Sequence, residues 1–253
     1  MINKIAILYT TFLRDDLMYK TVKSILDNLS DNCFLFIADQ GLKTEEKNLF
    51  YKSLPADKVF QWYLDYDCGL SIARNFLVKE AKSKGFAFCL LTADSIMVTQ
   101  PLENLNFYID FLESHEDYGI VGFKLNNRVS WEKLLRKNWL NDKFMVKNAS
   151  ERQIFDDRSF LRCDIVRNFF LAKTECLFKN PWDNELKLGE HEIFFWNLKT
   201  LTYWKVFYNE LYEAQYIKTY NEDYKKMRMR LYKQFVPLMM KKYHLNMWLG
   251  EDK

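Results

Sequence analysis

The residues best suited to chemistry lie between positions 65 and 100. This stretch reads as a polar loop, then a helix with Arg74 and Asn75 in its first turn, then an apolar strand that ends in Thr92-Ala93-Asp94. A helix N-terminus beside a guanidinium suits a diphosphate, because backbone N–H groups and Arg both donate to phosphate oxygens. A carboxylate at a strand end, facing that phosphate, suits a divalent cation with hard oxygen ligands. We therefore predict a diphosphate and metal site here.

The elements that must position these residues alternate between strand and helix in the first half of the chain. Strands are predicted at residues 4–9, 33–38, 59–64 and 86–91, and helices at 15–29, 45–53 and 72–84. This order predicts an α/β fold with a mostly parallel central sheet flanked by helices. In such sheets ligands bind beyond the carboxyl ends of the strands. Those ends are residues 10–14, 39–41, 65–69 and 92–95, and the last three each contain an acidic residue.

The second half of the chain is less regular. Strands are predicted at residues 119–124 and 163–172, and helices at 131–142 and from residue 190. From Tyr208 onward the pattern is helix-like and is broken only by Pro237. We predict one domain over residues 1–205 and a basic, amphipathic helical C-terminal extension over residues 206–253.

Composition narrows the classes of function. The chain has 37 basic and 34 acidic residues, a balance that predicts no nucleic-acid partner. Its five cysteines include no C-x-x-C pair, which favours reduced thiols in a cytoplasmic protein. The glycine motifs of dinucleotide and P-loop sites and the G-x-S-x-G elbow do not occur. No apolar stretch reaches the roughly 18 residues that would span a bilayer.

The C-terminal segment carries basic residues beside Met and aromatic residues at helical spacing. The basic residues are Lys225, Lys226, Arg228, Arg230, Lys233, Lys241 and Lys242. Such a helix would suit the inner face of the cell membrane or a lipid-linked acceptor. The same pattern also fits a helix that packs on the domain, or on a second subunit of a homodimer, with its lysines in water.

The loop, helix and strand of residues 65–100 resemble the nucleotide-sugar half of the GT-A glycosyltransferases. In that family G-x-[SA]-x-[AG]-R-N precedes a strand ending in Asp-x-Asp, and residues 69–75 (GLSIARN) match the first motif. The second motif reads Thr92-Ala93-Asp94, without its first acid. The resemblance implies that Asp94 binds Mn²⁺ or Mg²⁺. It also implies a set of residues around the nucleotide, with Asp39 against the base: Thr10, Thr11, Arg14, Asp39, Asp67, Gly69, Arg74, Asn75, Thr92 and Ala93.

Residues 163–196 look like the acceptor side of inverting, family 2-like GT-A enzymes, closest to the β-1,4-N-acetylgalactosaminyltransferase-like group. There an N-F-F-L-A-[RK]-T strand leads to a W-D pair and an E-H-x-[ED]-F-F helix start. Here residues 168–174 (NFFLAKT), Trp182-Asp183 and Glu190-His191-Glu192 fill these positions. The resemblance implies that Glu190, or else His191, takes the proton of the acceptor hydroxyl, with His191 alternatively a metal ligand. Trp182, Asp183 and Glu192 would contact the acceptor.

The resemblance implies a metal-dependent inverting glycosyltransferase. It would move an N-acetylhexosamine or hexose from a nucleotide-diphosphate donor, favoured as UDP-linked, to a hydroxyl of a surface glycan such as lipopolysaccharide or capsule. Three rivals stay open: alditol-phosphate transfer from a CDP donor, a non-catalytic nucleotide- or glycan-binding subunit, and a peripheral membrane scaffold. Ordinary structural roles also stay open for Arg74 and Asn75 in a helix turn, Asp94 in a turn, and His191 and Trp182 in the core.

Overall fold

The computed structural model describes residues 3–126, 151–217 and 222–245. The predicted helix at residues 131–142 lies outside them. Within them, ten strands form one sheet in the order β3-β2-β1-β4-β9-β6-β10-β8-β7, with β5 also paired to β10. The strands are β1 (Ile5–Thr11), β2 (Cys33–Asp39), β3 (Val59–Tyr63), β4 (Phe88–Ala93), β5 (Ile96–Val98), β6 (Tyr118–Asn126), β7 (Arg152–Phe155), β8 (Arg158–Cys163), β9 (Phe170–Lys173) and β10 (Lys205–Tyr216).

The sheet is mostly parallel, as the alternation of strands and helices predicts. Strands β3, β2, β1 and β4 are parallel neighbours, and β6 is parallel to β10. Strand β9 runs antiparallel between β4 and β6, and β5 and β8 run antiparallel to β10. The predicted α/β fold class is therefore confirmed.

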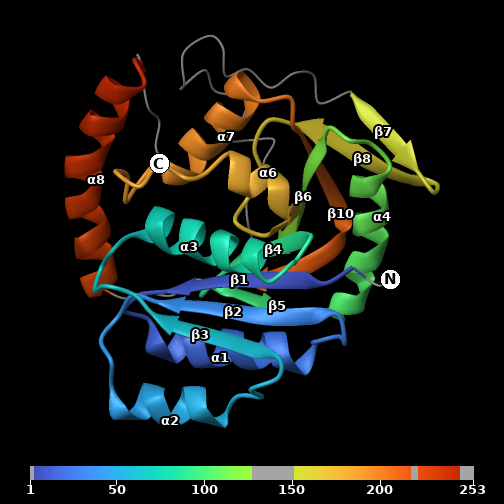
Figure 1. The fold of residues 1–253 in the computed structure, drawn as a ribbon. Helices are drawn as coiled ribbons and strands as arrows, with labels where there is room; N and C mark the ends of the chain where they lie inside the picture. The colour runs from blue at the N-terminus through green and yellow to red at the C-terminus, as the bar shows by residue number, and fades with distance from the viewer. Residues whose placement is uncertain (1–2, 127–150, 218–221, 246–253) are drawn as a thin grey trace.

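Helices cover both faces of the sheet (Figure 1). They are α1 (Asp15–Asp27), α2 (Glu45–Ser53), α3 (Leu70–Ser83), α4 (Leu105–Glu113), α6 (Thr174–Lys179), α7 (Glu190–Leu201) and α8 (Glu222–Lys242), with a 3-10 turn at Leu102–Asn104. One apolar cluster joins one face of the sheet to α3, α6, α7 and α8. The other joins the opposite face to α1 and α4. Because both faces are covered, all seven residues of β1 are buried.

Two predicted elements of the second half are wrong. The strand predicted at residues 163–172 is divided, because β8 ends at Cys163 and pairs with β10 whereas β9 begins at Phe170 and pairs with β4 and β6. The helix predicted from Tyr208 is a strand as far as Tyr216. Tyr208, Leu211 and Tyr212 have helical spacing, but Tyr208 pairs with Gly122 of β6, and after a register shift the pairing resumes at Glu213 with Lys124.

The C-terminal helix α8 packs on the domain. Leu231, Phe235 and Met239 are buried in the same apolar cluster as α3 and α7, and Figure 1 shows α8 along one side of the molecule beside these helices. The boundary predicted at residue 205 coincides with the start of β10, a strand of the central sheet. The predicted extension over residues 206–253 therefore begins with a strand, and its helix begins only at Glu222.

Candidate active site

The carboxyl ends of β1, β2 and β4 bring several predicted residues side by side. In the strand register Thr11 lies opposite Asp39, and Thr10 lies opposite Ala93. Thr10, Thr11 and Asp39 are buried. The hydroxyl of Thr92, also buried, has no hydrogen-bond partner within the described residues, which is common where a ligand or water completes a site.

Arg14 and Asp94 form an ion pair at this edge of the sheet. Arg14 directly precedes α1, and Asp94 directly follows β4. The Nε of Arg14 donates to Oδ2 of Asp94 at 2.8 Å, and one Nη donates to Oδ1. The ring of Tyr224, in the first turn of α8, lies 4.2 Å from the guanidinium. The guanidinium is thus fixed by a carboxylate and by an aromatic ring.

Asp94 is held from a second direction. The hydroxyl of Thr21, from α1, donates to its backbone oxygen at 2.7 Å. Burial raises the pKa of the Asp94 carboxyl to about 6, although the charge and hydrogen bonds of Arg14 act to lower it. The side chain is only 6% exposed, so its two oxygens face the protein and Arg14.

Asp39 is fully buried and hydrogen-bonded on both oxygens. The backbone N–H of Gly41 donates to Oδ1 at 2.8 Å, and the hydroxyl of Tyr51 donates to Oδ2 at 2.9 Å. Lys47 of α2 bridges Asp39 at 3.1 Å and Asp15 at 2.9 Å. The structure therefore places Asp39 within a buried network whose lysine the sequence pattern did not single out.

The loop after β3 contacts Lys187, which belongs to residues 163–196, the predicted acceptor side. Lys187 lies 3.1 Å from a carboxylate oxygen of Asp67, and its ammonium also donates to the backbone oxygen of that residue. Gly69 has a φ of +99°, and a Cβ there would meet Lys187 at 3.0 Å. Only glycine adopts this conformation without strain, so Gly69 serves the entry to α3. Its N–H donates to the side-chain oxygen of Gln40 at 2.7 Å.

Arg74, the fifth residue of α3, contacts residues 163–196, the predicted acceptor side. Its Nη1 is 3.4 Å from Oε1 of Glu190, and its guanidinium lies 5.4 Å from the ring of Trp182. Burial lowers the pKa of Arg74, and the charges of Glu190 and Glu192 oppose this. Trp182 also stacks on Phe194 with ring centroids 4.3 Å apart and is 2% exposed. Its ring therefore packs in the core.

Asn75 fastens the same segment to α3. Its side-chain oxygen accepts from the N–H of Trp182 at 2.9 Å, and its amide donates to the backbone oxygen of Trp182 at 2.8 Å. One turn earlier, the hydroxyl of Ser71 donates to the backbone oxygen of Leu186 at 3.0 Å. In this structure Arg74 and Asn75 hold the two predicted halves of the site together.

The start of α7 carries the predicted acid–base residues in a buried setting. Gly189, with a φ of +79°, precedes Glu190, His191 and Glu192, all of which are buried. Nε2 of His191 lies 2.7 Å from the backbone oxygen of Val166, an acceptor, so this nitrogen carries the proton. Burial, with the charges of Arg74 and Arg167, lowers the pKa of His191 to about 3. His191 is therefore neutral and weakly basic.

The C-terminal end of α8 is tied to the predicted acceptor side. Lys242 and the hydroxyl of Tyr243 contact Oδ2 of Asp183 at 2.8 Å and 2.7 Å. Burial raises the pKa of Asp183, but these two hydrogen bonds outweigh it and the net shift is downward. The thioether of Met239 lies against Gly189, where an added Cβ would approach the sulfur to 2.5 Å.

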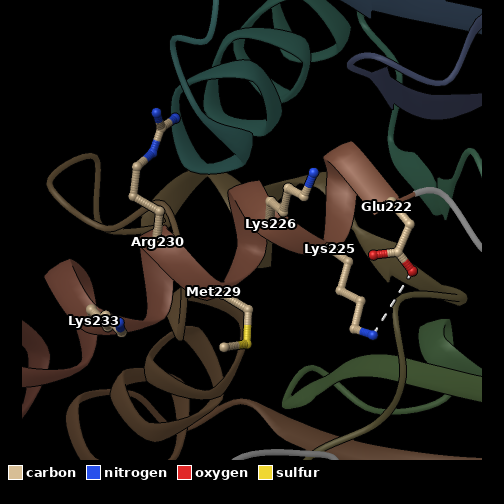
Figure 2. Close-up of a pocket in the computed structure, with 6 residues that line it drawn as sticks. All are labelled: Glu222, Lys225, Lys226, Met229, Arg230 and Lys233. Carbon is tan, nitrogen blue, oxygen red and sulfur yellow. Dashed lines mark ion pairs between the residues drawn. The ribbon is translucent and has the colours of Figure 1, made fainter.

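The outward side of α8 is basic. A shallow pocket of about 450 Å³ lies against this side. Figure 2 shows the residues that line it, which are Glu222, Lys225, Lys226, Met229, Arg230 and Lys233. Lys226 and Arg230 extend to one side of the helix, whereas Lys225 turns back toward Glu222 (Figure 2). Among the described residues, no helix combines the length and hydropathy that a bilayer crossing requires.

The side chains around Asp94 do not fit a divalent ion as they stand. Thr92 occupies the place of the first acid of the motif, and Arg14 takes both oxygens of Asp94. Within residues 3–126, 151–217 and 222–245, no group of three His, Cys, Asp or Glu side chains is placed to hold an ion. The cation that Asp94 binds in this structure is a guanidinium.

Sequence reasoning missed four residues that shape this site. Lys47, Lys187, Tyr224 and Lys242 each contact a predicted site residue. Lys187, Tyr224 and Lys242 are remote in sequence from their partners. Lys47 follows Asp39 by only eight residues, but lysines are too common in the sequence for a pattern to select this one. The one usable signal was the repetition of acids at the strand ends, each of which needs a positive partner when buried.

No protein-family model and no curated protein matches the sequence. Solved structures do match. S. aureus TarS 1-349 is 13% identical with a TM-score of 0.57, over 84% of this chain and 60% of that one. Its complex with UDP-GlcNAc gives a TM-score of 0.58 at 13% identity, over 86% and 60% of the two chains. The mannosyltransferase PcManGT from Pyrobaculum calidifontis, in complex with GDP-Man and Mn²⁺, gives 0.60 at 11% identity, over 85% and 57%.

These likenesses establish the fold. The chain has a glycosyltransferase fold of the GT-A type, and it spans about 60% of the length of the TarS 1-349 and PcManGT chains. The finer resemblance, to the N-acetylgalactosaminyltransferase-like group, stays a prediction.

Proposed function

We propose that this protein is an inverting glycosyltransferase that binds a nucleotide-diphosphate sugar at the carboxyl ends of β1, β2 and β4. The observation that carries the proposal is a pair of charged groups tied to these strand ends. Arg14 pairs with Asp94 just beyond β1 and β4 and offers a cation for a diphosphate. Glu190 offers a buried carboxylate at the start of α7 and pairs with Arg74 of α3, the helix whose entry at Gly69 is hydrogen-bonded to Gln40, just beyond β2. Structures of the same fold have been solved with UDP-GlcNAc and with GDP-Man, which supports a nucleotide-sugar donor, with UDP favoured.

The proposed reaction is a single displacement at the anomeric carbon. The acceptor oxygen forms a bond to that carbon on the face opposite the diphosphate, and its proton passes to a carboxylate oxygen of Glu190. The bond between the carbon and the diphosphate oxygen breaks, and its electron pair leaves with the nucleoside diphosphate. His191 is a poorer base, because its pKa is lowered to about 3. The proposal routes no step through Mn²⁺ or Mg²⁺, because the ligand set around Asp94 is incomplete.

The acceptor is proposed as a glycan or lipid-linked glycan of the cell surface, reached from the cytoplasmic side. The basic outward face of α8 supports a location on an anionic membrane surface. Sedimentation with phosphatidylglycerol vesicles tests this. Replacing Lys225 and Lys233 by Glu should release the protein, and equal binding of the variant would contradict it.

The proposed donor chemistry is tested by release of nucleoside diphosphate from UDP-, GDP- and CDP-linked substrates by the full chain. We expect one donor to be consumed, and Glu190→Gln to lose activity at least a hundred-fold in protein that circular dichroism shows to be folded. Its melting temperature should fall, because the substitution removes the charge that is paired with the buried Arg74. Glu175→Gln, an exposed carboxylate on α6, is the matched control. Release of CMP from CDP-ribitol or CDP-glycerol, with no nucleoside diphosphate released from any sugar donor, would favour alditol-phosphate transfer, because that reaction breaks the bond between the two phosphates. Binding without consumption of any donor would favour a non-catalytic subunit.

A further inference from the structure

The pair formed by Arg14 and Asp94 stands where the resemblance places a metal ion. Asp94 alone remains of the motif, and its oxygens accept from Nε and one Nη of Arg14. A guanidinium has five N–H donors on three nitrogens, so this pairing leaves one nitrogen uncommitted to Asp94. Tyr224 covers the guanidinium at 4.2 Å. The guanidinium of Arg14 is thus a cation that is already fixed in place at the end of β1.

We infer that Arg14, held by Asp94 and Tyr224, binds the donor diphosphate and stabilises its departure in place of a divalent ion. This inference rests on the proposed function. A divalent ion held by two carboxylates has no net charge, and neither has the pair of Arg14 and Asp94. In this pair the guanidinium is the more exposed group, and the carboxylate of Asp94 is the more buried one. As the glycosidic carbon–oxygen bond breaks, the diphosphate gains one negative charge, and a fixed guanidinium can stabilise that charge without moving.

Asp94 and Tyr224 act in this account as positioning residues. Arg14 lies at the surface end of the pair, with its side chain 15% exposed against 6% for Asp94. Only Arg14 is therefore presented to solvent and to a donor. The carboxylate of Asp94 orients the plane of the guanidinium through two hydrogen bonds, and the ring of Tyr224 limits its movement on another side.

Calorimetric titration of the full chain with UDP and with GDP, in EDTA and in Mn²⁺, distinguishes a diphosphate site built on Arg14 from a metal site built on Asp94. The two kinds of site predict opposite changes in nucleotide affinity when Arg14 or Asp94 is replaced. We expect one nucleotide to bind with the same affinity, within about two-fold, in both buffers. Arg14→Gln should weaken binding at least ten-fold in both, as loss of a charge-assisted hydrogen bond does. Asp94→Asn should tighten the binding of the nucleotide, because it removes the carboxylate charge that is paired with Arg14, while the amide oxygen can still accept a hydrogen bond from the guanidinium. Arg158→Gln, on β8, is the matched control.

A metal site would give the reverse. In that case nucleotide binding would need Mn²⁺, would be lost in Asp94→Asn, and would be kept or tightened in Arg14→Gln. This result would overturn the inference about Arg14, but the proposed function would stand. If no nucleotide or sugar nucleotide binds in either buffer, both fail together. Tyr224→Ala should weaken binding several-fold and Tyr224→Phe should restore it, because the ring and not the hydroxyl covers the guanidinium. Lack of rescue by Phe would remove Tyr224 from the account.

Discussion

Arg14 and Asp94 are 80 residues apart in the sequence and form one pair in the fold. The sequence predicted that a carboxylate at position 94 would bind a cation. Which cation it binds depends on the neighbour that the first loop supplies, and a linear pattern does not contain that neighbour. Arg74 and Asn75 show the same limit. Their motif indicated a nucleotide site, and in the fold their side chains contact Trp182 and Glu190.

His191 provides a prediction at the scale of one residue. Its pKa is lowered from 6.5 to about 3 in the folded protein. Unfolding therefore takes up a proton between these values, so the contribution of this group to stability is complete above pH 6.5 and declines as the pH falls toward 3. Between pH 7 and pH 5 the loss should be about 2 kcal/mol.

Denaturant unfolding at both pH values measures this loss. His191→Gln should show a flatter pH dependence than the parent protein by about that amount. His115→Gln, at an exposed histidine, is the matched control. Equal pH dependence in His191→Gln and the parent protein would contradict a buried neutral imidazole.

Among the elements, α8 was the hardest to interpret from sequence. Its basic residues and its methionines fit an interfacial helix and a packed helix equally well, because both need one apolar face. The structure buries Leu231, Phe235 and Met239 on the domain and leaves Met229 and Tyr232 exposed. The first half of the chain was easier to predict. Strands β1, β2 and β4 are nearly continuous apolar runs, which indicate strands buried on both faces of a sheet.

The contact of Met239 with Gly189 gives a prediction at this scale. Met239 is fully buried, whereas Met229 on the same helix is 59% exposed. Met239→Ala should reduce the free energy of unfolding by about 2–5 kcal/mol, because it leaves a cavity against the start of α7. Met229→Ala should change it by less than about 0.5 kcal/mol. Similar values for the two variants, from denaturant titration, would show that α8 does not support α7.

At the scale of the whole molecule, β10 lies between β6 and β8 in the sheet, and in the chain it leads to α8. It pairs with β6, β8 and β5. The predicted boundary at residue 205 failed to anticipate this, because the pairing partners of residues 205–216 are as far away as β5 and β6. Local spacing resembled a helix, and long-range pairing decided the outcome.

Truncation tests this role of β10. A chain that ends at residue 204 should fail to fold, because β6, β8 and β5 each lose the strand beside them. A chain that ends at residue 217 keeps the sheet and loses α8. It should retain strand structure by circular dichroism while melting at a lower temperature. A cooperative, native-like transition in the shorter chain would contradict the single-sheet account and restore the predicted boundary.

Hydrogen exchange on the full chain, with and without the sugar nucleotide that it consumes, would show directly where the donor binds. A donor at the carboxyl ends of β1, β2 and β4 should slow exchange in peptides covering residues 10–14, 39–41 and 92–95, and at the start of α7. Peptides of β7 and β8, at the far edge of the sheet, should not change. Protection confined to the outward face of α8, or to β7 and β8, would contradict a donor site at the carboxyl edge.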